Sequence, residues 1–115
     1  MIGKRLNARF YATAAGREPV REWLLRISPE DRRTVGYDIG KIEDGWPLGM
    51  PLARSLGVGL WEVRSDLSGG RIARVIFIAE AGVMILLHGF EKKSQKTPQG
   101  ELEIARKRLA DFRRR

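Results

Sequence analysis

Two apolar runs separated by a three-residue break restrict the folds open to this chain more than any other feature of its sequence. The runs cover residues 71–79 and 83–90 and are rich in Ile, Val, Leu and Phe. Each has the length of a strand, and the break Glu80-Ala81-Gly82 suits a hairpin rather than a crossover. The pattern therefore predicts a β-hairpin at the centre of a small sheet. Because both faces of each run are largely apolar, we expect helices on at least one side of the hairpin and further strands beside it.

Two polar side chains interrupt the apolar runs: Arg74 and the single histidine, His88. With a three-residue turn at 80–82, Ala79 pairs with Val83, and this register places Arg74 directly opposite His88 on one face. A two-residue turn would instead place them on opposite faces. The predicted shared face thus depends on an odd turn length.

A third antiparallel strand is predicted over residues 60–65, where apolar and charged side chains alternate strictly. If the following loop, residues 66–70, is also odd in length, Glu62 lies opposite Arg74. Together with the hairpin register, this pairing predicts one sheet surface that carries four ionisable side chains, namely Glu62, Arg64, Arg74 and His88.

Three amphipathic helices complete the prediction. Pro19 opens the first at its favoured position, and Ser28 is the expected N-cap of the second, which Gly45 ends. Thr97-Pro98 marks the start of a C-terminal helix with an apolar stripe. A first strand is predicted over residues 9–14, whereas residues 46–59, with Pro or Gly every few positions, are expected to form an ordered loop.

The chain has 115 residues, which fits a single domain over residues 1–115. The order of the elements predicts an α+β fold, with helices packed against a small antiparallel β-sheet. The sequence contains no cysteine and no apolar run of signal-peptide or membrane-spanning length. We therefore expect a cytoplasmic protein that makes no membrane contact.

The charge of the chain points to a polyanionic partner. The formal net charge is +8, and residues 92–115 hold nine lysines and arginines against three acids. Such asymmetry favours nucleic acid or an acidic protein as the partner. The alternative is that the final three arginines form only a solvated tail.

Two motifs in fixed order resemble those of a known family. Residues 59–64 read GLWEVR, and residues 90–98 read FEKKSQKTP. Together they resemble the RelE/ParE toxin superfamily, specifically its HigB-like, phage-derived branch, over most of the chain. The resemblance implies a RelE-like fold, with two N-terminal helices on one side of the sheet. It also implies the toxin of a type II toxin–antitoxin pair, a ribosome-dependent mRNA endonuclease silenced by a cognate antitoxin, which we expect to be a small helix-turn-helix protein.

The resemblance also implies which residues act on RNA. Cleavage needs a base for the 2′-hydroxyl, cations around the phosphate and an acid for the leaving oxygen. Basic residues on the sheet face and after the last strand match the family pattern, whereas the histidine or tyrosine that many members carry near the C-terminus is missing. No metal or cofactor is expected. The catalytic candidates are Arg64, Arg74, His88 and Lys92, and the RNA-binding candidates are Lys93, Lys96, Arg71 and Arg106.

Each candidate has a structural alternative. Arg64 or Arg74 can pair with Glu62 as an ion pair within the sheet, and a lone histidine in an apolar strand can be a packed, hydrogen-bonded residue. The lysines can be ordinary surface charge. Two other functions also remain compatible with the sequence, a non-enzymatic DNA gyrase inhibitor like those of the ParE branch and a plain RNA-binding module.

Overall fold

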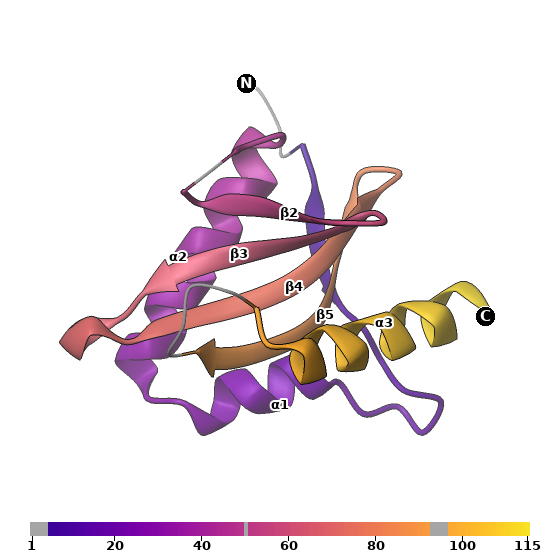
Figure 1. Cartoon of the computed structure of the whole chain (residues 1–115), viewed down its shortest axis with the longest axis horizontal. Coiled ribbons are helices and arrows are strands. Elements are labelled where there is room, and N and C mark those ends of the chain that lie inside the picture. The colour runs from indigo at the N-terminus through magenta and orange to yellow at the C-terminus, as the bar shows by residue number, and fades with distance from the viewer. Residues whose placement is uncertain (1–4, 50, 93–96) are drawn as a thin grey trace.

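The computed structural model of the chain, which describes residues 5–49, 51–92 and 97–115, has the predicted α+β fold (Figure 1). Its described strands form one sheet in the order β1-β5-β4-β3-β2. Strands β2 to β5 form an antiparallel meander, and β1 pairs in parallel with β5. The strands are β1 (Asn7–Phe10), β2 (Ala53–Gly57), β3 (Leu60–Asp66), β4 (Ile72–Glu80) and β5 (Val83–Lys92). The helices are α1 (Pro19–Arg26), α2 (Pro29–Gly45) and α3 (Gln99–Arg113), with a short 3-10 turn at Ser68–Gly70.

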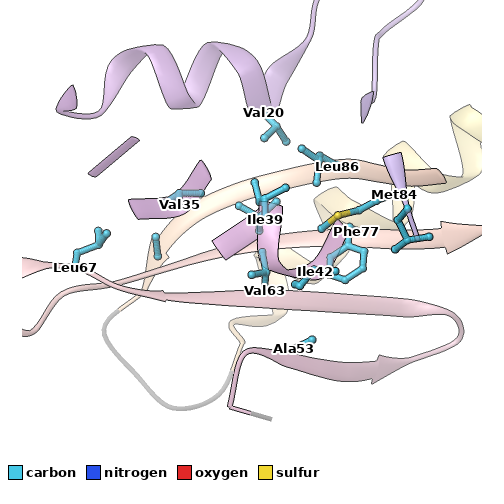
Figure 2. Packing of buried hydrophobic residues seen from close by; sticks show 13 residues of the cluster. Val20, Val35, Ile39, Ile42, Ala53, Val63, Leu67, Phe77, Met84 and Leu86 are labelled. Atoms are coloured by element: carbon cyan, nitrogen blue, oxygen red, sulfur yellow. The ribbon is translucent and has the colours of Figure 1, made fainter. Parts of the chain in front are cut away.

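Helices lie on both faces of the sheet. Figure 1 shows α2 behind the sheet and α3 in front of it, while α1 packs along β5. The larger apolar core fills the space between the sheet and the first two helices, and Figure 2 shows its side chains, among them Val35, Ile39 and Phe77. A second cluster, which includes Ala105 and Leu109, lies between α3 and the opposite face. In the part of the chain that the structure describes, no helix is both long and apolar enough to cross a membrane.

The helix boundaries follow the predicted start and stop signals. Pro19 is the first residue of α1, the hydroxyl of Ser28 accepts a hydrogen bond from the backbone N–H of Asp31 at 3.1 Å, and α2 ends at Gly45. The C-terminal helix differs in one respect. Its N-cap is Pro98, and the side chain of Thr97 bonds to a strand residue rather than to the helix.

The prediction of a loop over residues 46–59 is wrong in its second half, because residues 53–57 form β2 and pair with β3. The two strands join through Val58-Gly59, and both residues have positive φ, 48° and 83°. Two successive left-handed residues are the signature of the tight turn that matches strand twist. Strand β1 covers residues 7–10 rather than the predicted 9–14.

The turn of the central hairpin is one residue shorter than predicted. Glu80 pairs with Val83 across the two-residue turn Ala81-Gly82. Further along the hairpin, the register shifts at a bulge where Leu87 has no partner. The extra residue of the bulge restores the alternation that the shorter turn would have inverted.

As a result, Arg74 pairs with Phe90 and His88 pairs with Ile76, so the predicted direct pairing of Arg74 with His88 is wrong. The register between β3 and β4 is also displaced by two residues, because Arg64 rather than Glu62 lies opposite Arg74. A displacement of two residues keeps each side chain on its face. The prediction that Glu62, Arg64, Arg74 and His88 share one face of the sheet is therefore confirmed.

Candidate functional site

Cationic side chains from four neighbouring strands gather on the sheet face that α3 partly covers. Arg54 pairs with Glu62 across β2 and β3, Arg64 pairs with Arg74 across β3 and β4, and Lys92 projects from β5. The two residues of each cross-strand pair lie on the same face of the sheet. The charges of Arg54 and Arg64 act on both Arg74 and Lys92. We call Arg54, Arg64, Arg74 and Lys92 the basic cluster.

One buried carboxylate lies within the basic cluster. Glu62 is fully buried, and its Oε1 accepts a hydrogen bond from Nη1 of Arg74 at 2.6 Å. The hydroxyl of Thr97 donates to its Oε2, also at 2.6 Å. Glu62 therefore ties Thr97 to the centre of the sheet, and the structural alternative of an ion pair is confirmed for Arg74.

The two predicted catalytic arginines have different environments. Arg74 is 3% exposed, and its Nε has no hydrogen-bond partner among the described residues. The side chain of Arg64 is 31% exposed, and its Nε pairs with the exposed carboxylate of Asp66 at 3.1 Å. Arg64 is thus open to a ligand from solution, whereas the guanidinium of Arg74 is buried and paired with Glu62.

Lys92 is buried at the edge of the same cluster. Burial lowers the pKa of its amine below the usual value, and the neighbouring charge of Arg74 lowers it further, while Glu62 opposes the shift. A lowered pKa increases the neutral fraction of the amine near neutral pH. Lys92 therefore has the electrostatic environment of a lysine that accepts a proton.

His88 is held by hydrogen bonds at both ring nitrogens. Nδ1 lies 3.2 Å from Nη1 of Arg108, and Nε2 lies 3.2 Å from a carboxylate oxygen of Glu101. Because a guanidinium only donates, Nδ1 must accept and Nε2 must carry the proton that it donates to Glu101. Burial lowers the pKa of His88, the contact with Glu101 opposes this shift, and the charge of Arg108 adds to it. These contacts fit the alternative of a packed, hydrogen-bonded histidine.

The remaining candidates lie away from the cluster or outside the described residues. Arg71 is bound to the carboxylate of Asp31 through two hydrogen bonds, 2.9 and 3.1 Å long, and to Glu91 through a third at 2.8 Å. Arg106 is exposed on α3. Lys93 and Lys96 belong to residues 93–96, which the structure does not describe.

Arg54 is the member of the cluster that sequence reasoning missed. It lies in the segment expected to be a loop, so no strand face was assigned to it. The available signal was the sequence Gly57-Val58-Gly59 directly before a strand, which is typical of a hairpin turn and implies a partner strand before it.

In the described parts of the chain, no group of three or more His, Asp or Glu side chains is arranged to hold a metal ion.

The sequence model of one protein family, described as Phage derived protein Gp49-like (DUF891), matches residues 22–110. The chain belongs to this family. Gp49-like proteins are associated with RelE-like toxins. The matched span of the Gp49-like protein runs from α1 into α3 and contains every member of the basic cluster. A comparison with curated proteins finds no match.

Proposed function

We propose that this Gp49-like protein is the toxin of a type II toxin–antitoxin pair, of the HigB-like branch. In this proposal it cleaves mRNA on the translating ribosome in the cytoplasm, until a cognate helix-turn-helix antitoxin neutralises it. The family membership supports the toxin assignment. The observation that carries the RNA assignment is the basic cluster, in which four strands contribute cations to one sheet face around a single buried carboxylate.

The phosphate of the scissile bond would bind at the open side of the cluster. Arg64 is partly exposed and Arg54 is half-buried beside it. A guanidinium grips phosphate oxygens with two parallel N–H groups and keeps its charge at every physiological pH. Arg74, beneath them, forms the buried ion pair with Glu62, so the exposed positive charge of the cluster comes from Arg64 and Arg54. Such preorganised charge stabilises the phosphorane-like transition state as negative charge develops on its oxygens.

Lys92 is the group that we assign as general base. In its neutral form the amine accepts the proton of the 2′-hydroxyl, and the 2′-oxygen forms a bond to phosphorus. The bond from phosphorus to the 5′-oxygen then breaks, and that oxygen takes up a proton from solvent water as it leaves. The products are a 2′,3′-cyclic phosphate and a 5′-hydroxyl end. The lowered pKa of Lys92 supports this role, whereas both ring nitrogens of His88 are already engaged.

The test is 5′-end mapping of a reporter mRNA after brief induction of the protein, with and without ribosomes in a parallel purified reaction. Arg64→Gln is the test variant because its side chain is half-exposed, and Arg33→Gln, an exposed arginine of α2, is the control with the same loss of charge. We expect Arg64→Gln to reduce cleavage by about 100-fold and Arg33→Gln to cut like the parent protein. Intact mRNA beside arrested growth would refute the nuclease assignment and favour a gyrase inhibitor.

A further inference from the structure

A pocket of about 250 Å³ lies where α1, β5 and α3 meet. Its floor is the stretch of β5 around His88 and Gly89, beyond the residues of β5 that pair with β1. Pockets for drug-sized ligands have volumes of roughly 300–1,000 Å³. This pocket therefore suits a small chemical group rather than a large organic molecule.

The pocket is lined by three arginines and one carboxylate. Arg17 pairs with Glu22 at 2.6 Å, so these two charges largely neutralise each other. Arg26 and Arg108 also line the pocket, and neither forms an ion pair with any carboxylate in the described parts of the chain. Two guanidinium groups without an ion-pair partner thus face one small volume, with Glu22 and Glu101 as the carboxylates whose charges act on them.

Arg108 is the more informative of the two because it is partly buried. Its Nη1 donates to the backbone carbonyl of Leu87 at 2.8 Å and to Nδ1 of His88 at 3.2 Å, and both acceptors are neutral. Burial lowers the pKa of the guanidinium, and the electrostatic effects of Tyr11, Glu101 and Glu22 oppose this shift without reversing it. Among the described residues, only Nη1 of this side chain makes hydrogen bonds. Its other N–H groups remain available to a ligand.

We propose that this pocket is a second phosphate-binding site, in which Arg26 and Arg108 hold a phosphate group beside His88. Phosphate matches the planar donor groups of arginine and supplies the missing negative charge. On RNA, and there resting on the proposed function, the site holds a backbone phosphate other than the one that is cleaved. His88 and Glu62 both pair with Ile76, from opposite sides, so the backbone of His88 lies about two strand spacings, or roughly 10 Å, from that of Glu62 in the basic cluster.

The single histidine of the chain gives a direct readout of phosphate binding in the pocket. Its imidazole carbon-bound protons produce one set of NMR signals, and these report on the pocket because His88 lines it. The protein is titrated with inorganic phosphate at fixed pH and ionic strength, with chloride as the reference anion. We expect a saturable shift of the His88 signals with phosphate and only a small, non-saturating drift with chloride.

Two matched pairs of variants locate the binding site. Arg26→Gln removes a pocket residue, and Arg21→Gln removes an exposed arginine of the same helix that does not line the pocket. Arg108→Gln and Lys107→Gln form the corresponding pair on α3. We expect the pocket variants to weaken phosphate binding at least about tenfold, as loss of a charged hydrogen bond implies, and the controls to stay within twofold. Since Arg108 also supports the backbone of β5, the decisive variant is Arg26→Gln, whose side chain is exposed.

Equal weakening by Arg26→Gln and Arg21→Gln, or no saturation with phosphate, would overturn the proposal. A parallel titration with the dinucleotide ApA, which contains one phosphodiester, separates the two sources of the phosphate group. Saturable binding of ApA supports the RNA subsite, and binding of inorganic phosphate alone overturns that assignment in favour of a free phosphate. These titrations need no cleavage. Their failure is therefore distinct from failure of the nuclease assignment, which Arg64→Gln tests.

Discussion

Glu62 and Arg74 form an ion pair inside the protein, with 2.6 Å between Oε1 and Nη1 and with side chains 0% and 3% exposed. The pair lies within the basic cluster, because Glu62 is the cross-strand partner of Arg54 and Arg74 is the cross-strand partner of Arg64. It lies beneath the more exposed Arg64, and Glu62 also accepts a hydrogen bond from the hydroxyl of Thr97, two residues before α3. The same two residues therefore support the arrangement of the site from within the protein.

Removal of one member of the pair should cost more stability than removal of both. Glu62→Leu leaves the buried guanidinium of Arg74 without an anion, which is expected to lower the free energy of unfolding by about 3–5 kcal/mol. The double variant Glu62→Leu/Arg74→Leu replaces the pair by apolar groups and should be more stable than Glu62→Leu alone. Urea unfolding followed by circular dichroism measures all four members of the cycle. Additive losses would show that the two charges are not coupled in the folded protein.

The pH dependence of cleavage should identify Lys92 as the base. Only the neutral amine can accept the 2′-hydroxyl proton, so cleavage should rise with pH and level off above the pKa of Lys92, which lies below that of an ordinary lysine. Lys92→Arg keeps the positive charge but cannot lose its proton near neutral pH, and should reduce the rate by about 10²–10⁴-fold. Cleavage rates between pH 6 and pH 9 test this, with Lys107→Arg as the control. A Lys92→Arg variant with the parental rate and profile would exclude the assignment.

The shared face of the candidate site was predictable from sequence although the pairings within it were not. Alternation fixes which side of a sheet a residue occupies, and any displacement by two residues preserves that side. Between β3 and β4 the displacement is two residues. In the central hairpin, the turn is one residue shorter than expected and the bulge at Leu87 adds one residue, so the two deviations cancel. The helices were predictable because Pro19, Ser28 and Gly45 act through local backbone chemistry.

What sequence reasoning missed depends on contacts that an element makes with another element. Strand β2 follows a segment rich in Pro and Gly, and it is stabilised by its pairing with β3 rather than by its own composition. Arg54 joins the basic cluster only through that pairing. Likewise, Arg108 is far from His88 in the sequence, and only the packing of α3 on β5 brings the guanidinium to the imidazole. No periodicity within either element indicates such a contact.

Stability should fall in mildly acidic solution because of His88. Its pKa is lowered in the folded protein, so between that value and about 6.5, the ordinary value, the unfolded chain binds more protons. The contribution of His88 to the free energy of unfolding is therefore complete above about pH 6.5. It is lost as the pH falls through the pKa of the folded state, with a slope of at most about 1.4 kcal/mol per pH unit. His88→Gln keeps an acceptor and a donor but does not titrate. Urea unfolding at pH 5, 6 and 7 should show a smaller loss for this variant than for the parent. Equal losses would assign the effect to other groups.

The contact between α1 and β5 gives the last prediction. A Cβ atom at Gly89 would lie 2.4 Å from Cε3 and 2.7 Å from Cζ3 of Trp23, so the rigid ring leaves no room for a side chain. Gly89→Ala should therefore lower the free energy of unfolding by about 1–3 kcal/mol. Gly100 in α3 is the matched control, because nothing lies within 4 Å of its added Cβ. Gly100→Ala should raise stability by about 0.5–1 kcal/mol, since glycine is a poor helix former. Opposite signs in thermal or urea unfolding would support the close packing of Trp23 on β5, whereas stabilisation by both substitutions would contradict it.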